Sequence, residues 1–219
     1  SVLMTGQELK AVGISLNLAP VVDVYTQPAN PVIGIRSFSS DPTQVAIWGK
    51  YALQGYKQAG VIAALKHFPG HGDVTVDSHE ALPVIAKKRE EMEKVELLPF
   101  RHLASQADMI MTGHLFVPEL DRQHCATFSK KMIQDLLRST FHFQGVIMSD
   151  SLAMDGILNQ CSVEEAALKS FKAGHDLILL GGKQLLASQK GLEFTFEDIK
   201  RVHHFLVEAV KQKQLSEQR

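Results

Sequence analysis

Apolar runs rich in β-branched residues alternate with amphipathic helical patterns along this chain, and the alternation limits the possible folds more than any other feature. Five runs are predicted to be strands, at residues 14–23, 60–65, 108–113, 145–150 and 176–182. Strands that are apolar throughout are buried on both faces, as in parallel sheets covered by helices. The pattern therefore predicts an α/β fold, either a β/α barrel or a doubly wound sheet.

The helices between these strands have recognisable start and stop signals. Asp41 and Pro42 suit the cap and first position of a helix that Gly60 ends. Helical spacing predicts core packing for Val45, Trp48, Ala52 and Tyr56 in this helix, and for Phe196, Ile199, Val202, Leu206 and Val210 in the last one. Other helices are predicted at residues 4–12, at 92–103 with a break at Pro99, from Ser129 to Arg138, and from the capping box Ser162–Glu165 to Ala173.

Polar side chains stand at the ends of four predicted strands: Asp23, the pair Lys66 and His67, His114, and Asp150. A barrel gathers the carboxyl ends of its strands around one mouth. A doubly wound sheet usually has a glycine-rich phosphate turn instead, and the patterns GxGxxG and GxxxxGK[ST] do not occur in this sequence. We therefore predict a (β/α)8 TIM barrel, with residues 1–219 as one domain. A complete barrel has eight strands and five are predicted here, so either short strands lack a clear pattern or the N-terminal strands are absent. We expect the second.

The composition is that of an ordinary soluble globular protein, with 219 residues, 45% hydrophobic residues, 21% charged residues and a formal net charge of -1. The balanced charge provides no basic surface for nucleic acid, and no apolar run reaches the length of a membrane span. Cys125 and Cys161 are too few for a disulfide framework, which favours a reducing, cytoplasmic compartment.

Residues 66–83, KHFPGHGDVTVDSHEALP, form a strongly polar connection and are the predicted site of function. Pro69 and Gly72 exclude a helix here, so lysine, histidine and aspartate side chains are concentrated in one loop. His67 and His71 are four residues apart, as metal ligands on a helix are. The break at Pro69 and the lack of a third ligand at fitting spacing argue against a metal site. A solvated surface loop is the alternative interpretation.

The motifs of this loop and of the flanking strands resemble those of the glycoside hydrolase family 3 β-N-acetylglucosaminidases. KHFPGHG followed by DSH, within residues 66–79, fits that family's signature position by position. NLAPVVDV and NPVIGIRSF upstream, and MTGHL and VIMSDSLAM downstream, are similar to further family segments in the right order. The resemblance covers almost the whole chain and implies a TIM-barrel glycosidase.

The resemblance also implies residue roles. Asp150 matches the family's nucleophile, His79 its general acid/base, and Asp77 the partner of that histidine. The implied sugar-binding residues are Arg36, Lys66 and His67. By resemblance the protein is a retaining exo-glycosidase that removes terminal β-linked N-acetylglucosamine through a glycosyl-enzyme intermediate, without metal or cofactor. The implied substrates are muropeptides from peptidoglycan recycling.

The residue types suit this chemistry on their own terms. Retaining hydrolysis needs a carboxylate that attacks the anomeric carbon, and a second group that protonates the leaving oxygen and then deprotonates water. A histidine, whose ordinary pKa is about 6.5, can do both if a neighbouring carboxylate orients its ring. Taken alone, a histidine such as His79 is more often a structural or exposed residue than a catalytic one, and Asp150 is equally compatible with the cap of a turn.

One family segment, an acidic strand end followed by Gly-Gly-Arg, has no counterpart in this sequence. We therefore expect weak or absent hydrolysis by these residues alone. We expect a monomer if the barrel is complete, and association with another chain if it is truncated. Two alternatives stay open: a non-catalytic protein that binds N-acetylglucosamine-containing saccharides, and a phosphorylase that transfers the sugar to phosphate.

Overall fold

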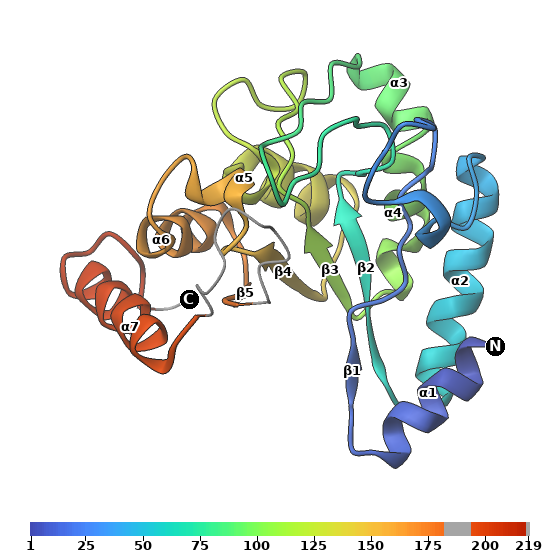
Figure 1. Cartoon of the computed structure of the whole chain (residues 1–219), viewed down its shortest axis with the longest axis horizontal. Coiled ribbons are helices and arrows are strands. Elements are labelled where there is room, and N and C mark those ends of the chain that lie inside the picture. Colours follow the sequence, from blue (N-terminus) through green and yellow to red (C-terminus); the bar gives the residue numbers. More distant parts are fainter. Residues whose placement is uncertain (182–193, 218–219) are drawn as a thin grey trace.

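The computed structural model describes residues 1–181 and 194–217, and its centre is a five-stranded parallel sheet (Figure 1). The strands are β1 Leu16–Asn17, β2 Ile62–Phe68, β3 Met109–Thr112, β4 Val146–Ser151 and β5 Leu177–Leu179. They pair in chain order, β1-β2-β3-β4-β5. A doubly wound sheet reverses its order at the switch point, so this sequential order is that of a barrel segment. All five predicted strands are confirmed, although residue 182 lies outside the described residues.

The first predicted run forms a shorter regular strand than expected. Pro20 has no backbone N–H and interrupts the pairing after β1. The backbone still follows β2, because the Lys66 N–H donates to the Pro20 carbonyl (3.2 Å) and the Val22 N–H donates to the Lys66 carbonyl (2.8 Å). Asp23, the next residue, therefore lies beside the carboxyl end of β2.

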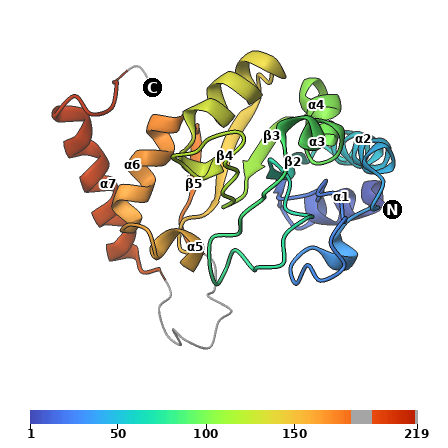
Figure 2. The same ribbon diagram turned by 90° about the horizontal axis from the view of Figure 1, so that it is seen from above.

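Helices cover the outer face of the sheet in an arc (Figures 1 and 2). α1 packs on α2, both α2 and α4 contact β2, α6 contacts β5, and α7 packs on α6. Their bounds are α1 Val2–Ala11, α2 Pro42–Gln58, α3 Arg89–Lys94, α4 Leu97–Leu103, α5 Asp155–Leu158, α6 Val163–Ala173 and α7 Phe196–Lys211. The shorter 3-10 turns are η1 Gly34–Arg36, η2 Ala104–Gln106 and η3 Ala126–Phe128, and η4 Lys131–Thr140 is wound as a π-helix.

Alternate strand residues separate two apolar layers. Leu65, Ile110 and Ile147 belong to the main core between the sheet and the helices. The residues of opposite parity form a second layer on the inner face, made of Ala64, Met109, Met111 and Met148, with Leu18 and Leu179 against it. Side chains alternate along a strand, so Lys66, two residues after Ala64 in β2, and Asp150, two residues after Met148 in β4, lie on this same inner face. The charged residues thus top the inner apolar layer.

Several predicted helix signals are confirmed. Asp41 Oδ1 accepts the backbone N–H of Thr43 (2.7 Å) at the start of α2. Ser162 Oγ accepts the backbone N–H of Glu165 (3.2 Å), which completes the capping box of α6. Ser129 Oγ accepts a backbone N–H from the first turn of η4 (3.1 Å). These bonds satisfy N–H groups that have no partner inside a helix.

The prediction that Trp48 packs in the core is wrong. Its side chain is 51% exposed and lies beside the ring of Tyr51, while the other three residues of the predicted stripe are buried. The buried face of α2 is rotated toward Gly49, where a Cβ would lie 2.7 Å from Leu103 Cδ1. The helix packs closely at this glycine, and a search for apolar side chains does not count a glycine as part of the buried face.

The packing predicted for the last helix is correct only from Val202 onward. Val202 is buried, whereas Phe196 is 69% exposed and Ile199 is 43% exposed. Arg201 bonds to Glu164 in the first turn of α6 (Nε to Oε1, 3.1 Å), so the residues of α7 before Arg201 lie beyond the N-terminal end of α6 in space. Their apolar side chains extend past the helix that was expected to cover them. The remaining two predicted core residues are half-buried.

The break in the third predicted helical region lies earlier than Pro99. α3 ends at Lys94 and α4 begins at Leu97, so Pro99 is the third residue of α4. Proline is tolerated in a first turn because the N–H groups there have no partner within the helix. The prediction of a break was correct, but the proline belongs to the restart and not to the interruption.

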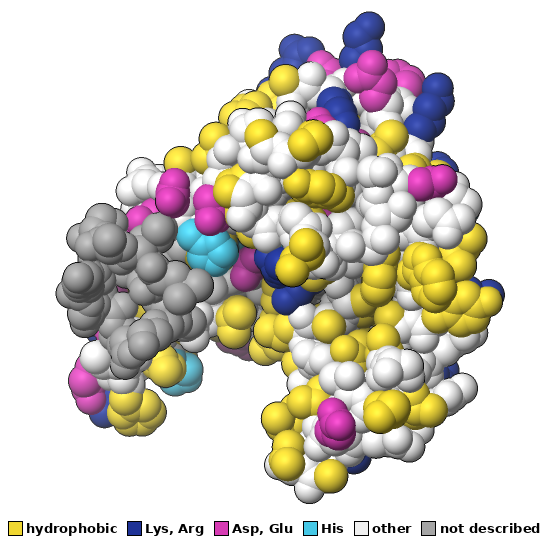
Figure 3. Space-filling model, turned by 45° about the vertical axis from the view of Figure 1, so that its right-hand side comes forward, with side chains coloured by type: hydrophobic (Ala, Val, Ile, Leu, Met, Phe, Trp, Pro, Cys, Tyr) yellow, Lys and Arg dark blue, Asp and Glu magenta, His cyan; other side chains and the backbone are white. Residues whose placement is uncertain are grey.

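The inner face of the sheet borders a hollow, at whose head acidic, basic and histidine side chains come together (Figure 3). Apolar side chains at the opposite strand ends are partly exposed, with fractions of 36% for Leu16, 43% for Ile62 and 44% for Leu177. None of the described helices combines the length and apolarity that crossing a membrane requires. The predicted incomplete α/β barrel is confirmed as a curled five-stranded parallel sheet, and closure into eight strands stays a prediction.

Candidate active site

Asp23 is fully buried and anchors the carboxyl end of β2. Its Oδ1 accepts the backbone N–H groups of His67 (3.0 Å) and His71 (2.7 Å), and its Oδ2 lies 2.7 Å from His67 Nδ1. Burial alone would raise the pKa of this carboxyl, but the contacts with His67 and the charge interaction with His71 hold the pKa below its ordinary value. Asp23 is therefore ionised, and His67 Nδ1 carries the hydrogen of this contact.

The other ring nitrogen of His67 faces Asp150. Nε2 lies 3.9 Å from Asp150 Oδ2, and Asp150 Oδ1 accepts the backbone N–H of Ser151 (2.7 Å). Burial would raise the pKa of Asp150, yet His67, His114, the Ser151 N–H and Lys66 together lower it. An ionised carboxylate at the end of β4, facing the hollow, is the form that a glycosyl-accepting nucleophile needs.

Two cations belong to the same region. The pKa of Lys66 is lowered by burial and by the charge of Arg36, while Asp150 and Asp23 oppose the shift. Arg36 lies in η1, is exposed, and donates from one guanidinium nitrogen to the Val32 carbonyl (3.2 Å). The mutual influence of these charges is consistent with the predicted cluster of Arg36, Lys66 and His67 near Asp150.

The predicted pair Asp77 and His79 is formed within the loop. Asp77 Oδ1 accepts the backbone N–H of His79 (2.8 Å) and lies 2.6 Å from His79 Nδ1. Because a carboxylate only accepts, Nδ1 carries the hydrogen of this contact and Nε2 is directed away from Asp77. The side chains are 40% exposed for His79 and 25% exposed for Asp77. This geometry holds an imidazole in one orientation at a site that solvent can reach.

His114 lies behind Asp150 and is fully buried. Its Nε2 is 2.8 Å from the Ser151 carbonyl and its Nδ1 is 2.7 Å from Thr127 Oγ1. Burial lowers the pKa of His114, so the ring is neutral at pH 7, with the hydrogen on Nε2 because the carbonyl can only accept. His114, which the sequence places at a strand end, thus bonds to the backbone and steadies the residue that follows Asp150.

The base of the loop is tied to α4 through charged side chains. Lys87 Nζ lies 2.9 Å from Asp73 Oδ2 and 2.6 Å from Oε1 of the fully buried Glu96, and Thr26 Oγ1 donates to Asp73 Oδ1 (2.6 Å). Burial raises the pKa of Glu96 despite its contact with Lys87. The loop is therefore fixed to the scaffold and is more than a solvated surface segment.

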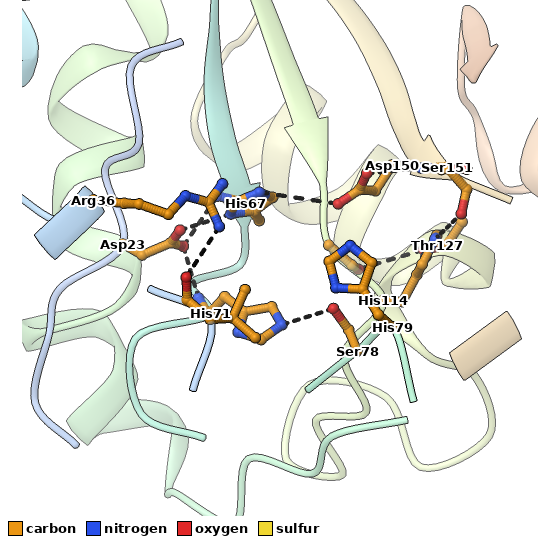
Figure 4. Close-up of polar contacts among 12 residues, drawn as sticks. Asp23, Arg36, His67, His71, Ser78, His79, His114, Thr127, Asp150 and Ser151 are labelled. Atoms are coloured by element: carbon orange, nitrogen blue, oxygen red, sulfur yellow. Dashed lines mark hydrogen bonds and ion pairs between the residues drawn. The ribbon is translucent and has the colours of Figure 1, made fainter. Parts of the chain in front are cut away.

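Figure 4 shows the two sides of the opening. Asp23, Arg36 and His67 lie on one side, and Asp150, His114 and His79 lie on the other, so all predicted site residues belong to one region. Sequence reasoning missed the parts played by Asp23, His71, Ser78 and Thr127. Asp23 had one visible signal, its position at a strand end, and His71 and Ser78 had another, their place in the KHFPGHG and DSH motifs. Thr127 had none. Among the described residues, no group of three or more His, Cys, Asp or Glu is arranged to hold a metal ion.

Comparison with known proteins assigns the chain to a family. Residues 2–219 match the model for the glycosyl hydrolase family 3 N-terminal domain. The chain belongs to glycosyl hydrolase family 3. The membership inferred from the loop motifs is thereby confirmed.

Curated relatives and solved structures agree with this family 3 membership. Beta-hexosaminidase A of Pseudoalteromonas piscicida is 42% identical over 188 residues, which are 80% of this chain and 31% of that protein. Beta-hexosaminidase of Idiomarina loihiensis is 39% identical over 173 residues, covering 79% of this chain and 52% of that protein. The family 3 β-N-acetylglucosaminidase structure from Paenibacillus sp. str. FPU-7 has a TM-score of 0.91 and 37% identity, covering 99% of this chain and 39% of that one. The chain thus spans between 31% and 52% of the length of these relatives.

Proposed function

We propose that this chain carries the catalytic residues of a retaining β-N-acetylhexosaminidase that removes terminal β-linked N-acetylglucosamine. The proposal rests chiefly on one observation: the ionised Asp150 carboxylate and the Asp77–His79 pair belong to the same opening at the strand ends. Relatives named beta-hexosaminidase and β-N-acetylglucosaminidase support the same activity. Because the chain spans only part of those proteins, the activity is proposed for the site and not transferred from their names.

In the proposed first step, Asp150 attacks the anomeric carbon and the bond to the leaving oxygen breaks. Doubly protonated His79 gives the proton on Nε2 to that oxygen while Nδ1–H stays on Asp77, whose carboxylate stabilises the ring charge. The products are a glycosyl ester on Asp150, a free alcohol and a neutral His79. In the second step, His79 Nε2 takes a proton from water, the hydroxide oxygen bonds to the anomeric carbon, and Asp150 leaves as a carboxylate.

The sugar is proposed to bind between Lys66, His67 and Arg36. His67 is held by Asp23, so its Nε2 is a fixed partner for a sugar hydroxyl. Lys66 supplies N–H donors on the inner face, and the planar guanidinium of Arg36 can form paired hydrogen bonds. Muropeptide fragments of peptidoglycan are the proposed natural substrates, and the cytoplasmic compartment stays a prediction from composition.

The decisive experiment measures release of a chromogenic leaving group from an N-acetyl-β-glucosaminide, in parallel with and without inorganic phosphate. Because the chain lacks one sugar-contacting segment of the family, the expected result is weak hydrolysis that is independent of phosphate and that gives first the β-anomer of N-acetylglucosamine by proton NMR. Turnover that requires phosphate would favour a phosphorylase. Saturable binding of N-acetylglucosamine without any turnover would favour a sugar-binding protein and contradict the proposed activity.

The variants Asp150→Asn and Ser170→Ala provide the matched comparison for this assay. Ser170 is buried in α6, and its hydroxyl bonds to the Ala166 carbonyl (2.8 Å), away from the opening. Loss of the nucleophile should abolish turnover, since an amide cannot form the glycosyl ester. Loss of the Ser170 hydroxyl should leave the rate unchanged. Equal rates in both variants would mean that Asp150 is not the nucleophile.

A further inference from the structure

The loop segment that carries His79 crosses the opening, and it is fastened at the preceding residue, Ser78. Ser78 is only 3% exposed although it belongs to a polar loop. Its Oγ lies 3.0 Å from His71 Nε2, and its carbonyl accepts the backbone N–H of Gly156 (3.3 Å). Figure 4 shows the contact with His71 reaching across the opening, next to the contact between His67 and Asp150.

The two partners of Ser78 belong to the two halves of the site. His71 is 2% exposed, and its backbone N–H donates to Asp23 Oδ1, the carboxylate that also holds the sugar-binding His67. Gly156 lies in α5, which directly follows the β4 segment that carries Asp150. Ser78 is therefore connected on one side to the sugar-binding residues and on the other side to the proposed nucleophile.

The contact with α5 is too close to admit a side chain. A Cβ on Gly156 would lie 2.7 Å from the Ser78 carbonyl oxygen and 3.1 Å from the carbonyl oxygen of Ala81. Both of these atoms are backbone, so they cannot move aside as the end of a flexible side chain would. The loop must lie against α5 at this position, which fixes its distance from the strand that carries Asp150.

The residues around Ser78 form one turn. The Asp77 carbonyl accepts the backbone N–H groups of Glu80 (3.0 Å) and Ala81 (3.0 Å), and the Asp77 carboxylate holds both the N–H and the ring of His79. A displacement at Ser78 therefore moves Asp77 and His79 together. The pair would remain intact, but its distance from Asp150 and from the leaving oxygen would change.

We propose that Ser78 is a positioning residue, which sets the Asp77–His79 pair at its catalytic distance by joining the loop to His71 and to Gly156. This inference rests on the proposed function, because it concerns how well His79 protonates a leaving oxygen. A group displaced by about 1 Å can lose about a hundredfold in rate. The loss should depend on how much the leaving group needs protonation, since general acid catalysis matters most for poor leaving groups.

The test compares kcat/KM for phenyl and dinitrophenyl N-acetyl-β-glucosaminides in Ser78→Ala, Gly156→Ala, His79→Ala and the control Ser170→Ala. In the first three variants, kcat/KM should fall about tenfold or more for the phenyl glycoside and change by about twofold or less for the dinitrophenyl glycoside. A variant that is merely less folded would lose both rates equally, and that result for Ser78→Ala would overturn the inference. If only His79→Ala lost more activity on the phenyl glycoside than on the dinitrophenyl glycoside, the positioning role of Ser78 would also be overturned, while the proposed function would stay intact.

Hydrogen exchange tests the same anchoring without turnover. In Ser78→Ala and Gly156→Ala, the backbone amides of residues 77–81 should exchange about tenfold faster than in the wild type, while the amides of β4 should exchange at the wild-type rate. In the control Ser170→Ala, the amides of residues 77–81 should also exchange at the wild-type rate. Unchanged exchange at residues 77–81 in Ser78→Ala would overturn the inference, whatever the activity. If the wild-type chain hydrolyses neither glycoside, the proposed function fails, and accelerated exchange would then still support Ser78 as the anchor of the loop.

Discussion

Replacing Asp23 by asparagine tests the buried carboxylate on which the strand end depends. Asparagine has the same shape, so its oxygen can still accept the backbone N–H groups of His67 and His71. Its NH2 group would face His67 Nδ1, which in the wild type donates a hydrogen bond to the Asp23 carboxylate. The substitution therefore weakens two hydrogen bonds from charged to neutral and removes the third.

The magnitude follows from these three bonds. A hydrogen bond to a charged group contributes about 1.5–3 kcal/mol and a neutral one about 1 kcal/mol, so two weakened bonds and one lost bond give a gross loss of about 2.5–7 kcal/mol. Part of it is offset because a charge is no longer buried, which leaves a net loss of about 3 kcal/mol. For a chain of this size, 1 kcal/mol corresponds to about 2–4 °C in Tm, so we expect a decrease of about 6–12 °C at pH 7.

The effect should depend on pH in a defined direction. The folded pKa of Asp23 lies below its ordinary value, so the ionised form is favoured by folding. That stability is fully present above the unfolded pKa of about 3.9 and is lost as the pH falls through the folded pKa. The difference in free energy of unfolding between wild type and Asp23→Asn should therefore be constant from pH 7 to about 5 and should narrow below about 4.

Thermal and urea unfolding, followed by circular dichroism across this pH range, provide the measurement. The control is Asp41→Asn, because the exposed Asp41 caps α2 and asparagine is an equally good cap, so its Tm should stay within about 1 °C. If Asp23→Asn behaved like this control, the buried carboxylate would not hold the strand end. A deficit that persisted unchanged to pH 3 would refute its assignment to the ionised form.

Three further predictions concern the loop and its surroundings. In Gly72→Ala the new Cβ would overlap the Val24 carbonyl oxygen, so a loss of about 3 kcal/mol or more in the free energy of unfolding is expected in urea. Wild-type stability of this variant would contradict that close contact. Burial lowers the pKa of Lys66, so affinity for N-acetylglucosamine, measured by calorimetry, should begin to fall at a lower alkaline pH than the titration of an ordinary lysine would give. Lys66→Arg should remove this fall, because arginine stays charged. If affinity fell with pH in the same way in both proteins, Lys66 would not be its cause. Lys87→Met should cost about 3 kcal/mol by leaving Glu96 without its cation, and the added change Glu96→Gln should restore most of it; a double variant no more stable than the single one would disprove the pairing.

Strand order and the gathering of polar strand ends could be predicted because they depend on local patterns. An apolar run predicts a buried strand, and a parallel arrangement brings the residues after such runs to one edge. Lys66, His67 and Asp150 were identified in this way and lie together in the structure. The Asp77–His79 contact was also predictable, since its two residues are neighbours in one loop.

The contacts that organise the site could not be predicted because they join distant positions. Asp23 accepts hydrogen bonds from residues 44 and 48 positions further along the chain, and hydrophobic periodicity carries no information about such pairing. Ser78 belongs to the DSH motif, but the motif does not reveal its contacts with His71 and Gly156. Close packing at glycine, as at Gly156, is likewise invisible to a search for apolar side chains.

Asp150 is proposed to form a covalent bond to the sugar, and incubation with a 2-fluoro glycosyl reagent followed by mass spectrometry detects that bond. We expect a mass increase of one glycosyl group, located on Asp150 by peptide sequencing, which disappears in Asp150→Asn and persists in Ser170→Ala. An adduct on another residue, or a chain that releases N-acetylglucosamine without ever forming an adduct, would contradict it.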